Sequence, residues 1–256
     1  MLLHGVPETA LMWQALFAEL ARDRTVLAPD LKGMGASEVK PPYDVPTLVD
    51  ELAALIRRQV DEPIDLVGHD WGGALAIAIA RFEPGLVRRL VIVNAPYRKV
   101  NYVRAAHIPF FALPVVPELL FRVGGTRLLR AMLHGAGRRK DRPLDEETAM
   151  AYAQPYRDMT RVRAMLGYYR WVARRRLSGR VRHGLLDGDV GAQSVLVVWG
   201  ARDSVLPLSV GDAVVRDVGV PVQYVTLPDA GHWPVEEEEE IAVPTIARFI
   251  RSGNAY

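Results

Sequence analysis

Hydrophobic positions along the chain follow two alternating patterns, and together they predict a repeated strand–helix order. Short apolar runs are typical of buried strands. They lie at 25–29, 63–67, 89–94, 194–199 and 222–227. Between them, apolar residues recur at every third or fourth position, which is typical of amphipathic helices. These stretches are 10–22, 45–60, 72–82, 208–217 and 240–251. The order predicts an α/β fold with a mainly parallel sheet and helices on both of its faces.

The alternation breaks between residues 97 and 186, where the pattern is mostly helical and rich in Arg, Tyr and Leu. We therefore expect residues 1–96 and 187–256 to form one core, and residues 97–186 to form a helical cap inserted between two strands. This insert holds 19 of the 32 Lys and Arg residues but 6 of the 30 Asp and Glu residues, so its net charge is +13 against −11 for the rest. A basic cap resting on an acidic core explains this asymmetry, and attraction of an anionic substrate is the alternative. Nucleic-acid binding is disfavoured, because the Arg residues are dispersed and no binding motif accompanies them.

Composition excludes several kinds of chemistry. The 256 residues include no Cys, which rules out disulfides, a thiolate nucleophile and a thiolate metal site. The first residues lack the basic region and cleavage signal of a secretory peptide, and no apolar run is long enough to span a bilayer. We expect a cytoplasmic protein without a membrane span. Glu236 to Glu240 is predicted to be the solvated start of a helix, where carboxylates suit the helix dipole.

The sequence Gly68-His69-Asp70-Trp71-Gly72 has the small-x-nucleophile-x-small form of a nucleophile elbow, with Asp at its centre. An apolar strand precedes it and a helix-forming stretch follows, as the motif requires. Serine in this place suits acyl transfer, but its attack on a saturated carbon would leave a stable ether. A carboxylate attacking that carbon gives an ester that water can hydrolyse. Asp70 therefore indicates displacement at sp³ carbon, such as epoxide opening or dehalogenation; the alternative is an Asp that only caps the helix.

Further motifs occur in order along the chain. They are His4-Gly5-Val6-Pro7, the stretch 28–37, the stretch 68–73, Val93-Asn94-Ala95-Pro96, the stretch 199–203 and Ala230-Gly231-His232-Trp233. This series resembles the α/β-hydrolase superfamily, and within it the branch of epoxide hydrolases and haloalkane dehalogenases. Members of that branch begin with an antiparallel hairpin ahead of the strand that runs into His4-Gly5, whereas residue 1 here already lies in that strand. Either this sequence starts late or the protein lacks the hairpin. In the second case we expect an unpaired strand edge near residues 1–3, which the partner in a homodimer would cover.

The resemblance implies a catalytic set. Asp70 is the nucleophile, His232 is the base, and Asp203 accepts a hydrogen bond from one imidazole nitrogen and so fixes the ring. Asp229 is the competing acid, and Asn94 stands where some relatives place theirs. The backbone amides of Val6 and Trp71 would form the oxyanion hole. The same resemblance implies that neither a metal nor an organic cofactor is needed.

The leaving group decides between the two activities of the branch. Tyr169 matches the ring-opening Tyr of epoxide hydrolases, with Tyr168 as the adjacent alternative, and a purely packing role remains open. His107 stands where these enzymes have a second Tyr, and Tyr102 is the other candidate for that role. The expected substrate-binding side chains are Trp71, Phe110, Phe111 and Tyr168.

A small hydrophobic epoxide and water are therefore the expected reactants. A haloalkane dehalogenase with the same Asp-His-Asp set is the first alternative, but Val6 offers no side-chain donor to a halide, and the sole cap Trp, Trp171, should point away from Tyr169. A binder without turnover is the second alternative, and an intact Asp70, Asp203 and His232 set argues against it.

Overall fold

The computed structural model describes residues 1–97, 106–137, 144–177 and 189–254. Five parallel strands form one sheet in the order β1-β2-β3-β4-β5. They are β1 (Leu2–Leu3), β2 (Ile64–His69), β3 (Val87–Val93), β4 (Ser194–Gly200) and β5 (Val222–Leu227). All parallel pairs point their carboxyl ends to the same edge of the sheet, which is where ligands bind in open α/β folds. The α/β fold with a parallel sheet is therefore confirmed.

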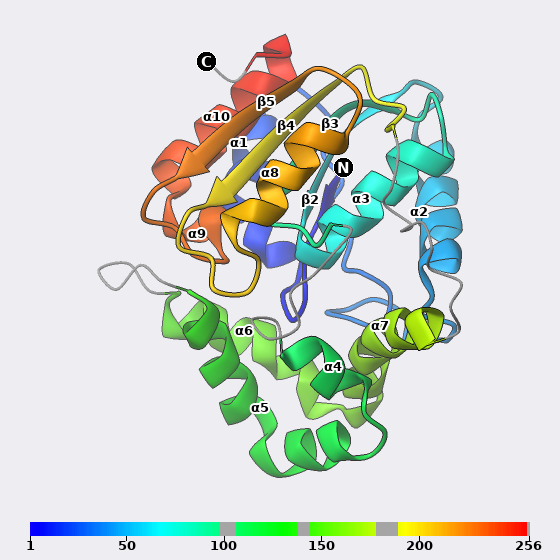
Figure 1. The fold of residues 1–256 in the computed structure, drawn as a ribbon, viewed down its shortest axis with the longest axis vertical. Helices are drawn as coiled ribbons and strands as arrows, with labels where there is room; N and C mark the ends of the chain where they lie inside the picture. Colours follow the sequence, from blue (N-terminus) through cyan, green and yellow to red (C-terminus); the bar gives the residue numbers. More distant parts are fainter. Residues whose placement is uncertain (98–105, 138–143, 178–188, 255–256) are drawn as a thin grey trace.

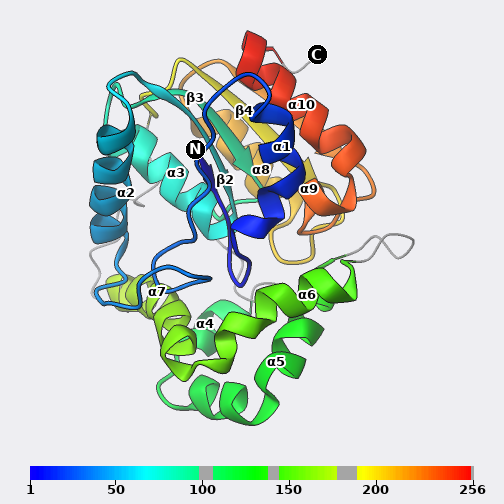
Figure 2. The same ribbon diagram turned by 180° about the vertical axis from the view of Figure 1, so that it is seen from behind.

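Helices cover both faces of the sheet (Figures 1 and 2). One face carries α2 (Val45–Gln59), α3 (Asp70–Phe82) and α8 (Leu208–Asp217). The other carries η1 (Ala10–Trp13), α1 (Gln14–Leu20), α9 (Pro234–Glu237) and α10 (Glu239–Ser252). The predicted helices agree closely with these bounds. Helices α2, α8 and α10 each bury one apolar face, and α2 also has a capping signal. The Asp44 carboxylate accepts the Thr47 amide at 3.0 Å, and Pro46 occupies the first turn.

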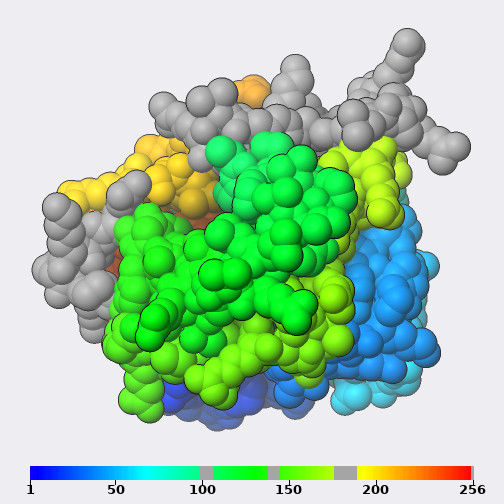
Figure 3. Space-filling model, turned by 90° about the horizontal axis from the view of Figure 1, so that it is seen from below, coloured from blue at the N-terminus to red at the C-terminus, as the bar shows by residue number. Residues whose placement is uncertain are grey.

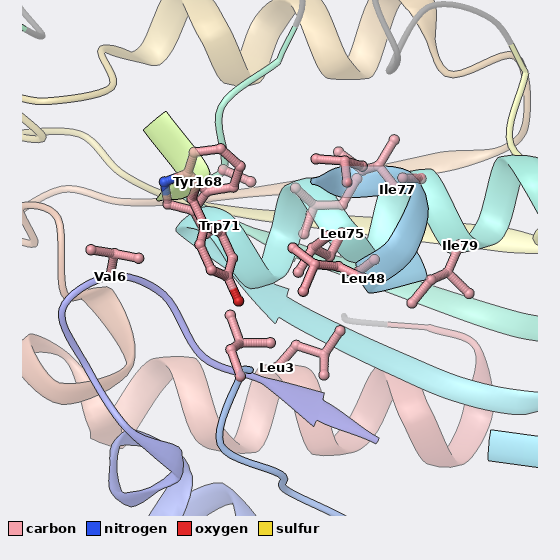
Figure 4. Packing of buried hydrophobic residues seen from close by; sticks show 14 of the residues in the cluster. Leu3, Val6, Leu48, Trp71, Leu75, Ile77, Ile79 and Tyr168 are labelled. Carbon is pink, nitrogen blue, oxygen red and sulfur yellow. The ribbon is translucent and has the colours of Figure 1, made fainter. Parts of the chain in front are cut away.

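Two apolar clusters hold these layers together. Figure 4 shows part of the larger one, in which Leu75, Ile77 and Ile79 of α3 pack with Leu48 of α2 and with Leu3 of β1. Helix α3 is buried on all sides from Asp70 to Ala80, which explains its run of Ala and Ile. The second cluster lies between the sheet and helices α1 and α10. Both clusters fix the carboxyl ends of the strands, where the candidate catalytic residues lie.

In the described part of the segment between β3 and β4, four α-helices lie together beyond the carboxyl edge of the sheet (Figure 1). They are α4 (His107–Ala112), α5 (Val116–Ala136), α6 (Glu146–Ala153) and α7 (Met159–Leu177), with η2 (Gln154–Arg157) between the last two. We call them the inserted helices. Within the described residues, no helix is both long enough and apolar enough to cross a membrane.

Two expectations about the first strands were wrong. Residues 25–29 do not form a regular strand; the amide of Leu2 donates to the carbonyl of Leu27 at 2.8 Å, and Pro29 has no N–H to extend such a ladder. Leu2 also pairs with Val67 of β2 and is 1% exposed. The segment near residues 1–3 is therefore not an unpaired edge, because it lies between β2 and the segment 25–29.

Candidate active site

Asp70 lies in a sharp turn at the carboxyl end of β2. Its φ angle is 45°, in the left-handed region that side chains other than Gly seldom adopt. The turn is tight: a Cβ on Gly68 would lie 2.4 Å from the Gly72 carbonyl oxygen, and one on Gly72 would lie 2.2 Å from the Leu3 carbonyl oxygen. Only glycine fits at both positions. The strand–turn–helix geometry therefore matches the nucleophile elbow that the sequence indicates.

The carboxylate of Asp70 is not a helix cap. His69 precedes α3 as its N-cap and makes no side-chain capping bond, whereas Oδ2 of Asp70 accepts the backbone amide of Val6 at 3.1 Å. Within the described residues, no hydrogen bond joins the Trp71 amide to Asp70. One of the two expected oxyanion donors thus already points at the carboxylate.

His232 and Asp203 form a buried pair. Nδ1 of His232 lies 2.8 Å from Oδ2 of Asp203. An ionised carboxylate only accepts, so Nδ1 carries the proton and Nε2 of the neutral ring is the basic nitrogen. Burial alone would lower the pKa of His232, but the Asp203 carboxylate outweighs it and the net shift is upward. The competing acid, Asp229, is exposed and pairs with Arg202 instead.

Three further hydrogen bonds hold Asp203 in place. Its Oδ1 accepts the amides of Val205 and Leu206 at 2.7 and 2.8 Å. The Asn94 side-chain amide donates to Oδ2 at 2.5 Å and to the carbonyl of Gly231 at 3.3 Å. These donors and His232 outweigh the effect of burial, so the pKa of Asp203 lies below its usual range. Asn94 was expected in the site but not in this role. Its side chain links the end of β3 to the loop that carries His232.

A second buried pair lies beside the nucleophile and was missed from the sequence. Nδ1 of His69 lies 2.7 Å from Oε2 of Glu8, and its Nε2 lies 2.8 Å from the carbonyl oxygen of His232. Both nitrogens face acceptors, which favours the doubly protonated ring. Burial lowers the pKa of His69, but Glu8 outweighs burial and raises it to about 9. A positively charged ring therefore lies next to Asp70 in the chain.

The glutamate run from 236 to 240 corrects another expectation. Glu237 and Glu238 are not solvated; they are 2% and 3% exposed. The Glu237 carboxylate accepts the amides of Gly231 and Trp233, both at 3.0 Å. These amides flank His232, so Glu237 fixes the loop that carries it. Glu238 similarly accepts the Ala230 amide at 3.2 Å. Because residues 236–240 are all Glu, nothing in the sequence indicated that Glu237 and Glu238 would be the buried ones.

A cavity of about 220 Å³ joins the strand ends to the inserted helices. Its described lining includes Asp70 and His232 from the core, and His107, Phe111 and Tyr169 from the inserted helices. The other lining residues are mostly apolar: Val6, Pro7, Leu129, Met132, Gly135, Ala136, Met165, Ser204, Val205 and Trp233. A site of this composition suits a small, largely apolar ligand.

Several expected substrate-binding residues lie behind this lining. The hydroxyl of Tyr168 donates to the carbonyl of Lys32 at 2.8 Å, so that Tyr is tied to the core. Trp71 packs edge-to-face on Tyr168 and Tyr169, with ring centroids 5.3 and 5.4 Å away (Figure 4 shows Trp71 and Tyr168). Phe110 packs on Phe111. The described lining includes none of Trp71, Tyr168 and Phe110.

The remaining polar candidates differ in their position. Trp171 is not part of the described lining, and its ring packs against the guanidinium of Arg175. Tyr102 lies outside the described residues. Tyr169 packs against His107, with ring centroids 5.9 Å apart. The inserted helices therefore bring one phenol and one imidazole into the cavity that contains Asp70.

Burial moves the pKa values of these two side chains in opposite directions. It raises the pKa of Tyr169 well above 10, with the nearby Asp70 adding to the rise and a hydrogen bond with the Trp71 side chain opposing it. It lowers the pKa of His107 below its usual 6.5. Both groups are thus neutral near pH 7, and each has a proton to donate in a hydrogen bond. Among the described residues, no group of three His, Cys, Asp or Glu side chains is arranged to hold a metal ion.

Comparison with known proteins agrees with the geometry. The family model described as alpha/beta hydrolase fold matches residues 1–239. Epoxide hydrolase 4 of Homo sapiens is 23% identical over 267 residues, which cover 98% of this chain and 72% of that protein. The AB hydrolase superfamily protein YfhM of Bacillus subtilis is 27% identical and covers 98% and 89%. The crystal structure of epoxide hydrolase VrEH1 from Vigna radiata is 26% identical and covers 98% and 90%, with a TM-score of 0.81. The chain belongs to the family with the alpha/beta hydrolase fold.

Proposed function

We propose that this protein is an epoxide hydrolase that converts a small apolar epoxide to a vicinal diol. The observation that carries the proposal is the lining of one cavity by a carboxylate in an elbow, a histidine that is paired with the buried Asp203, and a protonated phenol. Relatives named epoxide hydrolase span nearly the whole chain, which supports the same activity. In this proposal the inserted helices, within 97–186, act as the cap that closes the cavity.

The first half of the proposed cycle opens the ring. A carboxylate oxygen of Asp70 attacks one epoxide carbon, and the bond from that carbon to the epoxide oxygen breaks. Tyr169 and His107 donate to the departing oxygen, which takes a proton and becomes a hydroxyl group. Asp70 is then joined to the substrate as an alkyl ester. Such a donor is what separates epoxide opening from dehalogenation, since a halide leaves without a proton.

The second half of the proposed cycle hydrolyses the ester. Nε2 of His232 takes a proton from water, and the hydroxide adds to the Asp70 carbonyl carbon. The Val6 and Trp71 amides stabilise the oxyanion, and removing one donor of this kind typically raises the barrier by about 3 kcal/mol. As the intermediate collapses, His232 passes its proton to the departing diol oxygen. The Asp70 carboxyl then gives its proton back to Tyr169 or His107, whichever protonated the epoxide oxygen, which restores the carboxylate. The overall change is epoxide plus water to diol, and no cofactor takes part.

The lining of the cavity suits epoxide hydrolysis better than haloalkane dehalogenation. The described lining contains no Trp171 indole and no side-chain donor at Val6, while the Trp71 indole is engaged with Tyr169. A phenol and an imidazole, which are proton donors, lie in the cavity instead. For these reasons we propose no second activity.

The test is the mass of the His232→Gln variant after exposure to a panel of epoxides and haloalkanes. Without its base the enzyme should form the ester and fail to hydrolyse it. We expect a mass gain equal to a whole epoxide, located on the peptide that contains Asp70. The control is His232→Gln combined with Asp70→Asn, which should gain no mass.

Two results would contradict the proposal. A gain equal to an alkyl group without its halogen would make the protein a dehalogenase. No gain from any compound, together with calorimetric binding of the same compounds and retained binding in the double variant, would make it a binder.

A further inference from the structure

The inserted helices carry an unusual concentration of exposed aliphatic side chains. Eleven large hydrophobic residues are exposed among those that the structure describes, and six of them lie between residues 113 and 123. They are Leu113, Val115, Val116, Leu119, Leu120 and Val123, and Val123 is 88% exposed. Single exposed aliphatic residues are ordinary, but a contiguous patch indicates a binding surface.

Four of these residues form a regular stripe on α5. Val116, Leu119, Leu120 and Val123 are spaced i, i+3, i+4 and i+7, so they share one face of the helix. Phe121, on the opposite side, is 2% exposed and packs into the core. A stripe of this spacing normally faces a protein interior, yet here it faces outward. Figure 3 shows α5, in green, at this end of the molecule. We call the exposed aliphatic surface formed by residues 113–123 the apolar stripe.

Basic side chains border the apolar stripe. Arg122 and Arg127 of α5 and Arg163 of α7 are exposed. The one carboxylate within the stripe, Glu118, is neutralised by Arg170 at 2.7 Å. In the parts of the chain that the structure describes, no acidic side chain pairs with Arg122 or Arg127. The centre of this surface is therefore apolar, and its border is positively charged.

A hollow connects the apolar and basic parts of this surface. It has a volume of about 340 Å³ and is lined by Val115, Glu118, Leu119, Arg122, Met159 and Arg163. Two guanidinium groups and several aliphatic side chains therefore meet in one depression. Guanidinium groups bind phosphate oxygens well, because their donors match the geometry of the anion.

We propose that the apolar stripe docks this protein on an anionic phospholipid surface. Aliphatic residues flanked by Arg are the composition of helices that lie in a membrane interface, with the basic groups at the phosphates. The exposed stripe contains no Trp or Tyr, which are the usual anchors of a protein–protein interface. A second copy of the chain would bring Arg122 and Arg127 close to their own counterparts, so like charges oppose a symmetric dimer here.

The docking is independent of the proposed reaction. The stripe lies on the outer face of α5, and none of the six aliphatic residues lines the cavity that contains Asp70. An Asp70→Asn variant should therefore bind lipid as well as the unchanged protein does. Lipid binding and turnover fail separately, so each proposal has its own test.

The test is co-sedimentation of the whole protein with vesicles at low and high salt. One set is phosphatidylcholine alone, and the other contains phosphatidylglycerol as one lipid in four. We expect binding to the anionic vesicles, weakened by salt, and little binding to the neutral ones. Each Arg at an anionic surface contributes roughly fivefold to the partition coefficient, so Arg122→Gln with Arg127→Gln should lower it roughly 25-fold. Leu119→Gln with Val123→Gln should lower it by about tenfold or more.

Matched controls separate the stripe from general surface effects. Leu11→Gln with Ile241→Gln removes two aliphatic side chains that are 40% and 42% exposed elsewhere. Arg57→Gln with Arg58→Gln removes two exposed charges from α2. Both controls should bind as the unchanged protein does. Absence of binding to anionic vesicles, or equal losses in the controls, would overturn the proposal. A dimer in sedimentation velocity that the Leu119 and Val123 changes dissociate would assign the stripe to a second copy instead.

Discussion

The two sides of the cavity are built differently. On the core side, Asp203 accepts from His232, Asn94, Val205 and Leu206, and Glu237 accepts two more amides of the His232 loop. On the side of the inserted helices, Tyr169 has one hydrogen bond, with the Trp71 side chain, and otherwise packs against the rings of Trp71, His107 and Phe111. Buried hydrogen bonds fix direction, whereas ring packing fixes position less strictly. The base of the proposed ester hydrolysis, His232, therefore lies on the more strictly oriented side.

Electrostatics separates the two sides as well. Carboxylates next to His232 and His69 raise the pKa values of those rings against the effect of burial. His107 and Tyr169 lie in apolar surroundings, where burial favours the neutral form of each. One side of the cavity thus stabilises charge and the other keeps its proton donors neutral. The proposed reaction needs both properties: a neutral proton donor when the epoxide ring opens, and a base when the ester is hydrolysed.

The largest effect should come from the side of the inserted helices. Tyr169→Phe removes the proposed donor to the epoxide oxygen and should lower the rate of ring opening by about 10²- to 10⁴-fold. The matched control is Tyr168→Phe, because that hydroxyl donates to the Lys32 carbonyl and does not line the cavity. Stopped-flow measurement of ester formation checks both variants. A similar loss in the two variants would show that Tyr169 acts through packing alone.

The second-largest effect is expected from a variant on the core side of the cavity. Glu237→Gln replaces one of the two acceptor oxygens by an amide that faces a backbone N–H, so the loop of His232 should shift. Misplacement of about 1 Å costs roughly 10²-fold in rate. Because His232 acts only in the proposed second step, ester hydrolysis should slow and ester formation should not. Ester accumulation, measured by rapid quench and mass, checks this prediction.

Glu239→Gln is the control for Glu237→Gln, since Glu239 is exposed two positions along the chain. A purely structural role of Glu237 would slow both steps equally and lower the unfolding midpoint. A shift in the pH profile of ester hydrolysis, together with normal ester formation, would assign Glu237 to the positioning of His232.

Much of the fold and of the candidate site could be predicted from the sequence, because the nucleophile elbow and the strand–helix order each leave a local pattern in the chain. Asp70 needs two close glycines and a strand before it, and these are contiguous in the chain. The predicted bounds of α8 and β5 agree with the structure residue for residue. The residues that we expected on the two sides of the cavity likewise came from short motifs, each only a few residues long.

The missed features depend on contacts between distant segments. Glu8 and His69 are 61 residues apart, and Asn94 and Asp203 are 109 apart. No local pattern indicates which of five consecutive Glu residues turns inward, so burial of Glu237 and Glu238 was not foreseen. The failed strand at 25–29 has a similar origin, because its neighbour β1 is two residues long and supports little pairing. Tertiary placement, and not local propensity, decided each case.

The smallest effect concerns the pH dependence of stability on the core side. The pKa of His69 is raised to about 9 in the folded protein, above the ordinary value near 6.5. Its contribution to stability is therefore complete below pH 6.5 and is lost as the pH rises through about 9, at a slope of at most about 1.4 kcal/mol per pH unit. Relative to His69→Gln, the free energy of unfolding from urea titrations should fall across this window. Glu8→Gln should remove the same slope, because the carboxylate is what raises the pKa; parallel curves for all three proteins would mean that the pair is not ionised.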